Sequence, residues 1–152
     1  RIVNIGSVGG RVALPMLSAY DASKFAMEGV SDSLRRELRG FGVHVSIVEP
    51  GAVDTAIWRR SVEAADELVD HLPPEARELY GDLERAARRE VERSQRRAIP
   101  PDRVARVVAH ALTARRPRTR YLVGTEARMM VALSRLLGDR GFDALIARRM
   151  RA

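Results

Sequence analysis

The chain has 152 residues, of which 45% are hydrophobic, and a net charge of +7 from 27 Lys and Arg against 20 Asp and Glu. This apolar content supports one packed core and excludes a disordered chain, while the lack of cysteine excludes disulfide scaffolds and thiolate metal sites. No apolar run approaches the roughly 20 residues of a transmembrane helix, and the first residues lack the layout of a signal peptide. We therefore expect a cytoplasmic protein with no transmembrane segment and no metal.

The basic residues are almost all of one type. The chain contains 26 arginines and a single lysine, Lys24. A nucleic-acid-binding protein gathers its basic residues on one face or interleaves them with aromatic residues, whereas these alternate with acidic residues along predicted helices. A basic nucleic-acid module is therefore a rival interpretation that we do not favour, and we expect no nucleic-acid partner.

The first part of the chain predicts a strand, a helix and a second strand. Branched aliphatic residues form a short strand over residues 2–5, which meets a glycine-rich turn. Apolar residues at every fourth position then predict a helix over residues 18–39 with one buried face. These positions are Ala22, Ala26, Val30, Leu34 and Leu38, with Phe25 and Met27 beside them. A second strand over residues 43–48 ends before Pro50, and this order predicts a parallel crossover.

The remainder combines a charged insertion with a third strand. Residues 56–100 are dense in charge and carry apolar residues at helical spacing, which predicts an amphipathic insertion lying over the sheet. A helix follows, and residues 121–124 form a third strand. Two further helical patterns, separated by Gly138, close the chain.

Three strands are too few for a doubly wound α/β sheet, and the chain begins inside a buried element. No glycine-rich turn of the dinucleotide-binding type lies between a strand and a helix. We therefore interpret residues 1–152 as a single incomplete domain. It corresponds to the C-terminal half of a Rossmann-type doubly wound parallel sheet whose N-terminal half is missing from this chain.

Tyr20 and Lys24 are the first residues that carry chemistry. They stand four positions apart at the start of the predicted helix, so their side chains project from the same face. Chance gives such a pair a probability of about 2% in this composition. A tyrosine hydroxyl ordinarily has a pKa near 10, and an ammonium about 4 Å away favours its ionised form by about 4 kcal/mol at an effective dielectric of about 20. The pair is therefore suited to proton exchange near neutral pH.

Ser7 lies thirteen positions before Tyr20, at the carboxyl end of the first predicted strand. Ligands of open α/β sheets bind at this edge. The Ser7 hydroxyl is therefore placed to donate to the same carbonyl oxygen as Tyr20.

The order and spacing of three motifs resemble the short-chain dehydrogenase/reductase family. Ser7 is followed by the segment 20–24 (Tyr-Asp-Ala-Ser-Lys) and then by the segment 50–55 (Pro-Gly-Ala-Val-Asp-Thr) after the second strand. The resemblance covers about the first 55 residues. It implies an NAD- or NADP-dependent oxidoreductase that interconverts an alcohol and a ketone or aldehyde.

The resemblance also assigns roles to individual residues. Ser7 would orient the substrate carbonyl, Tyr20 would be the general acid/base, and Lys24 would assist Tyr20 and bind the nicotinamide ribose. The loop after the second strand would line the nicotinamide. Its contributing residues would be Pro50, Gly51 and the Val53 backbone, with Thr55 reaching the carboxamide or a phosphate.

Substrate and partner follow from the same family resemblance. Residues 118–124 are similar to the C-terminal part of members that act on retinoids, steroids and related lipophilic alcohols, and residues 56–100 match the family's variable substrate loop. Members commonly pair through the helix that carries the tyrosine, so a homodimer or homotetramer is expected. The alternative is a catalytically silent binding or oligomerisation module, since the chain lacks the glycine-rich cofactor turn.

Overall fold

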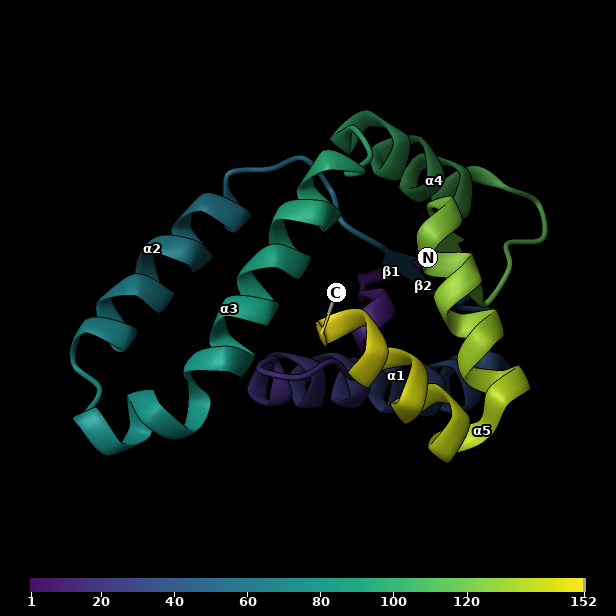
Figure 1. The fold of residues 1–152 in the computed structure, drawn as a ribbon. Coiled ribbons are helices and arrows are strands. Elements are labelled where there is room, and N and C mark those ends of the chain that lie inside the picture. Colours follow the sequence, from purple (N-terminus) through teal and green to yellow (C-terminus); the bar gives the residue numbers. More distant parts are fainter. Residues whose placement is uncertain (152) are drawn as a thin grey trace.

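The computed structural model describes residues 1–151 (Figure 1). Its strands are β1 (Ile2–Ile5), β2 (Val45–Pro50) and β3 (Arg120–Val123). Its α-helices are α1 (Ser18–Glu37), α2 (Ile57–Asp70), α3 (Pro74–Arg96), α4 (Pro101–Thr113) and α5 (Thr125–Arg151). Two short 3-10 helices complete the described chain, η1 (Val8–Gly10) and η2 (Leu38–Phe41).

The three strands form a parallel sheet in the order β1-β2-β3. Every residue of the central strand β2 is buried, as expected for a strand covered on both faces. Helices α1 and α4 lie on opposite sides of the sheet (Figure 1). The predicted α/β class with a parallel sheet is therefore confirmed.

Strand β2 differs slightly from its predicted bounds. Gly42 has a left-handed backbone, with φ of 70°, which turns the chain before the strand begins at Val45. At the other end, Pro50 belongs to the strand and pairs with Val123 of β3. Proline is tolerated there because the ladder continues through Gly51, whose N–H donates to the Val123 carbonyl at 3.0 Å.

The buried face of α1 is the opposite of the predicted one. The residues of this helix that are buried are Asp21, Glu28 and Ser31, which recur at helical spacing. The apolar stripe is exposed instead, with Phe25 at 46% and Val30 at 51% exposure. The polar face is turned inward because its side chains find partners there. The aliphatic stripe is exposed in its first part, and Leu34 and Leu38 are half-buried.

The charged insertion forms α2 and α3, but it stands beside the sheet rather than over it (Figure 1). It leaves and rejoins the domain at one point, because Val53 forms a parallel bridge with Ile99. Two backbone hydrogen bonds of 3.0 Å close this base, from Asp54 to Ile99 and from Ile99 to Ala52. The insertion is therefore rooted in the loop that follows β2.

Helix α5 contains the predicted interruption. Gly138 has φ of 61° and ψ of 179°, which breaks the helix into two segments. The second segment folds back so that Phe142 packs with Val131 and Val12 in a core cluster. Within the described residues, no helix combines the length and apolarity needed to cross a membrane.

Candidate active site

The predicted site residues gather at the carboxyl edge of the sheet. Because the strands are parallel, the segments that follow β1 and β2 emerge at the same edge, and these segments carry Ser7 and residues 50–55. The first turn of α1 brings Tyr20 to this edge, since α1 packs against η1 and β2. The fold thus brings together the three motifs that the sequence separates.

Ser7 and Tyr20 meet across Gly9. A Cβ atom added at Gly9 would lie 3.0 Å from Tyr20 Cε1 and 3.5 Å from Ser7 Oγ. The Ser7 hydroxyl caps η1 by accepting a hydrogen bond of 3.1 Å from the Gly9 N–H. Since that bond uses an acceptor lone pair, the hydroxyl hydrogen remains available to donate to a ligand.

Tyr20 and Lys24 lie on the same face of α1, as the spacing predicts. The Lys24 Nζ atom is 5.6 Å from the centre of the Tyr20 ring. Tyr20 remains 44% exposed, so its hydroxyl is accessible from outside. The ammonium is therefore close enough to stabilise negative charge that develops on the phenol oxygen.

Gly9 and Gly10 allow α1 to approach the loop after β1. A Cβ at Gly9 would lie 2.6 Å from Asp21 Oδ1, and a Cβ at Gly10 would lie 2.7 Å from the Lys24 backbone oxygen. Both distances are below any van der Waals contact, so only glycine fits. The same approach lets the carboxylate of Asp21 accept a hydrogen bond of 2.8 Å from the Leu14 N–H.

Asp21 was not singled out from the sequence. It is 3% exposed, and burial raises its pKa while the Leu14 N–H opposes the rise. Its position next to Tyr20 fixes the loop of residues 11–17 against the first turn of α1. The spacing of Asp21, Lys24, Glu28 and Ser31 along one helix face is a signal that could have identified it.

The loop after β2 is held by the insertion. Trp58, the only tryptophan of the chain, donates from Nε1 to the Val53 carbonyl at 3.0 Å. Thr55 is exposed and lines an open polar cavity of about 410 Å³, together with Asp54 and Gln95. Residues 50–55 therefore offer backbone and hydroxyl groups to a polar ligand.

A second cavity, about 90 Å³ in volume, is almost entirely apolar. It lies between the loop that precedes Tyr20, helix α3 and helix α5, and Trp58 also lines it. Its apolar lining residues are Leu14, Pro15, Met16, Leu17, Trp58, Ala87, Val91, Met130, Ile146 and Met150. At its rim, Arg149 Nε of α5 donates to Glu90 Oε2 of α3 at 2.8 Å.

Met16 adds backbone strain to this cavity wall. Its φ of 67° lies in the left-handed region, which costs a residue other than glycine about 1 to 3 kcal/mol. Strain of this kind persists where the surroundings hold the backbone in place. Met16 and Leu17 both line the cavity.

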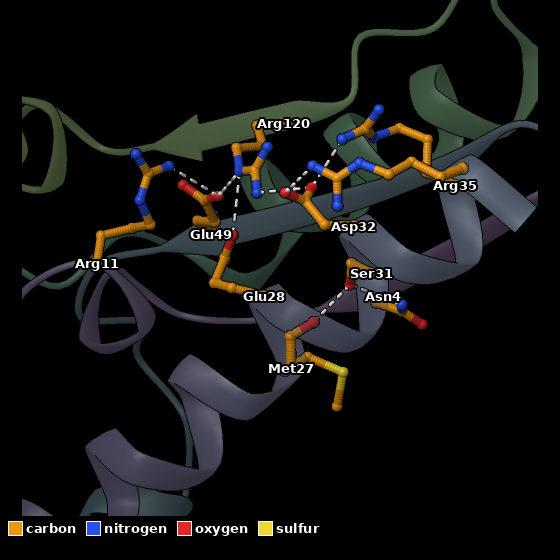
Figure 2. Close-up of polar contacts among 10 residues, drawn as sticks. Asn4, Arg11, Met27, Glu28, Ser31, Asp32, Arg35, Glu49 and Arg120 are labelled. Carbon is orange, nitrogen blue, oxygen red and sulfur yellow. Dashed lines mark hydrogen bonds and ion pairs between the residues drawn. The ribbon is translucent and has the colours of Figure 1, made fainter.

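A buried ionic cluster joins α1, β2 and β3 (Figure 2). Glu49, the residue before Pro50, is 0% exposed, and its Oε1 is 3.4 Å from both Arg11 Nη1 and Arg120 Nε. Arg120 Nε also donates to Glu28 Oε2 at 3.0 Å. Burial raises the pKa of Glu49 to about 7, the Glu28 carboxyl adds to this rise, and Arg11 opposes it. Sequence reasoning did not identify this cluster.

The comparisons with known proteins agree with the geometry. The family model described as short chain dehydrogenase matches residues 1–66, which include all three motifs. The rat (Rattus norvegicus) 17-beta-hydroxysteroid dehydrogenase type 6 is 39% identical over 155 residues, with 97% of this chain and 47% of the relative covered. Human (Homo sapiens) retinol dehydrogenase 16 is 39% identical over 134 residues, with 86% and 42% covered.

A solved structure shows the same arrangement of elements. The crystal structure of a short chain dehydrogenase from Burkholderia cenocepacia in complex with NADP matches with a TM-score of 0.60 at 26% identity. The match covers 97% of this chain and 47% of that one. The family model, the relatives and the shared fold together support membership of the short-chain dehydrogenase/reductase family. The chain spans about half the length of the curated relatives it matches.

Proposed function

We propose that this chain is the catalytic half of an NAD(P)-dependent oxidoreductase that interconverts an alcohol and a ketone or aldehyde. The observation that carries the proposal is the convergence of Ser7, Tyr20 and Lys24 at the carboxyl edge of the sheet. The names of the relatives, which are dehydrogenases of hydroxysteroids and retinol, support the reaction class.

The residues present fit the nicotinamide end of such a cofactor. Lys24 offers an ammonium beside Tyr20. The loop after β2 contains Pro50, Gly51 and Val53 and leads to Thr55, which is exposed. A structural neighbour binds NADP, which supports this assignment. When bound, the nicotinamide supplies or accepts a hydride. NAD and NADP are both compatible with the residues of this half.

In this mechanism the chain's own residues handle the proton. Ser7 donates its hydroxyl hydrogen to the substrate oxygen and thereby holds it next to Tyr20. Tyr20 gives a proton to that oxygen during reduction and takes it back during oxidation. Lys24 stabilises the phenolate that remains after the proton leaves, because its ammonium stays next to the ring.

The apolar cavity points to a lipophilic substrate. Its lining comes from the loop that precedes Tyr20, from α3 and from α5. Helix α3 belongs to the charged insertion and contributes the apolar side chains of Ala87 and Val91 to the cavity wall. Burial of apolar substrate surface there is favourable by about 25 cal/mol per Å². The retinol and steroid dehydrogenases among the relatives are consistent with this class.

Binding of reduced nicotinamide tests the proposal. The complete domain, with the N-terminal half that the relatives' length implies, should enhance NADH or NADPH fluorescence, and emission from Trp58 should fall in parallel because Trp58 adjoins the Thr55 cavity. The 152-residue chain alone should bind neither nucleotide. A complete domain that binds neither would favour the catalytically silent module instead.

Helix α1 supports the further proposal of a homodimer or homotetramer. Its exposed apolar stripe includes Phe25 and Val30, each about half exposed, beside the small residues Ala22 and Ala26. Small side chains let a second helix approach closely, while the larger ones bury area. Sedimentation of the complete protein should give a dimer or tetramer, and substitution of Val30 by Asp should yield monomers. A wild-type monomer would contradict this pairing.

A further inference from the structure

Three of the four members of the buried ionic cluster belong to segments that carry a site residue. Glu28 lies one helical turn after Lys24 on α1, and Glu49 directly precedes Pro50. Arg11 follows η1, in the loop that begins with Ser7. Arg120 begins β3 and contacts both carboxyl groups, so the cluster connects the three segments of the site through one set of charges (Figure 2).

Two buried oxygens in this cluster lack a donor. Glu28 Oε1 and Glu49 Oε2 have no hydrogen-bond partner among the described residues. The two carboxyl groups are gathered on one guanidinium, because Arg120 Nε lies 3.0 Å from Glu28 Oε2 and 3.4 Å from Glu49 Oε1. An unpaired buried acceptor is costly. A proton retained on Glu49 would remove one negative charge from the pair and would give the cluster a hydrogen-bond donor that it otherwise lacks.

We propose that Glu28 and Glu49 retain one shared proton and, with Arg11 and Arg120, act as positioning residues that hold Ser7, the Tyr20–Lys24 turn and the Pro50–Thr55 loop in register. This inference deepens the proposed function and rests on it. None of the four residues is assigned a contact with cofactor or substrate. Their effect is exerted through the segments that bear those contacts.

The surrounding charges allow one proton to be kept. Arg11 faces Glu49 from the loop after η1, and Arg120 faces it from β3. Asp32 Oδ1 of α1 is 2.8 Å from Arg120 Nη2, so Asp32 balances part of the positive charge that Arg120 presents to the two glutamates. Asp32 also pairs with Arg35 and Arg36. These are the charged groups that the described residues direct at the pair.

Loss of the proton should loosen the site. The pKa of Glu49 is raised from 4.5 to about 7, so the stabilisation from the retained proton is fully present below about pH 4.5 and lost as pH rises through about 7. Above that pH two carboxylates repel one another behind the Pro50 loop. Cofactor affinity and thermal stability should both fall with the same midpoint.

The first experiment detects the proton without relying on cofactor binding. Infrared difference spectra of the complete domain, recorded between about pH 5 and about pH 9, should show a protonated carboxyl band that disappears through about 7. The Glu49→Gln variant should lack this band and should not lose melting temperature over that interval. The Glu37→Gln variant changes an exposed carboxylate of α1, the helix that carries Glu28, and should keep both wild-type features.

The second experiment measures positioning. In Glu49→Gln or Glu28→Gln the amide supplies the missing donor, so the dissociation constant for NADPH or NADH should stay within about twofold of the wild-type value at about pH 6. The wild-type affinity should weaken at about pH 8, and that of Glu49→Gln should not. The double variant removes both carboxyl groups that Arg120 holds together and should bind about 10²-fold more weakly.

The outcomes separate the inference from the proposed function. A wild-type domain that shows the carboxyl band but binds no nucleotide would refute the proposed function and leave the proton in place. Absence of the band would overturn the inference. The inference would also be overturned if the fold-loss of affinity in the double variant equals the product of the fold-losses in the two single variants. A shared proton requires the two sites to be coupled, so the losses should not multiply in this way.

Discussion

Replacing Tyr20 with phenylalanine is expected to lower kcat of the complete enzyme by about 10² to 10⁴-fold, the range for a lost general acid/base. The ring that packs 3.0 Å from the Cβ position of Gly9 is retained, so the fold should be unchanged. Only the hydroxyl that we propose as the proton donor and acceptor is removed. The measurement is kcat at saturating cofactor and substrate, with the alcohol on which the wild type is most active.

Tyr80→Phe is the matched control for this substitution. Tyr80 lies on α3 and is 53% exposed, so its hydroxyl can be removed with little effect on turnover. Nucleotide affinity should remain near the wild-type value in both variants. A Tyr20→Phe enzyme with near-normal kcat would refute the assignment of Tyr20 as acid/base.

The second large effect is expected from Gly10→Ala. The new Cβ would lie 2.7 Å from the Lys24 backbone oxygen and 3.0 Å from its carbonyl carbon, and neither backbone atom can yield as a flexible side chain would. Overpacking of this kind costs about 1 to 3 kcal/mol of unfolding free energy. The displaced helix also separates Tyr20 and Lys24 from Ser7, so kcat should fall by about 10²-fold.

Gly40→Ala provides the comparison for this prediction. A Cβ at Gly40 meets no atom of the described chain within 4 Å, so stability and kcat should stay near the wild-type values. Denaturant unfolding and steady-state kinetics of the two variants separate steric displacement from a general effect of replacing glycine. Equal behaviour of the two alanine variants would show that the close approach of η1 and α1 is not required.

The predicted site residues were accessible from sequence because their geometry is local. Tyr20 and Lys24 are one helical turn apart, and Ser7 and Pro50 each follow a strand whose carboxyl end is readily identified. Parallel strands then bring the two loops to one edge without further information. The family comparison and the structure agree on this part of the chain.

The predicted buried face of α1 is wrong, because the apolar stripe of this helix is not the face that packs against the sheet. In the structure Asp21, Glu28 and Ser31 face inward, each with a hydrogen-bonding partner, which no count of hydrophobic residues can foresee. The partners of Glu28 lie 21 and 92 positions away along the chain, in β2 and β3. A cluster assembled from such distant residues is visible only once the sheet order is known.

The position of the insertion beside the sheet could not be predicted from the sequence either. Its amphipathic character was predicted from periodicity, but its position depends on the Val53–Ile99 bridge and on Arg149, which joins α3 to α5. A bridge between residues this far apart leaves no local pattern. The apolar cavity beside Trp58 follows from that placement.

The solitary lysine has a practical consequence for chemistry on this protein. Apart from the terminal amine, the chain offers acylating reagents one primary amine, and it stands 5.6 Å from the Tyr20 ring. Arginine, which supplies the other 26 basic side chains, does not react with such reagents at neutral pH because it stays protonated. Labelling of side-chain amines in this half is thereby confined to Lys24, beside Tyr20, and protection from labelling reports occupancy of that edge directly.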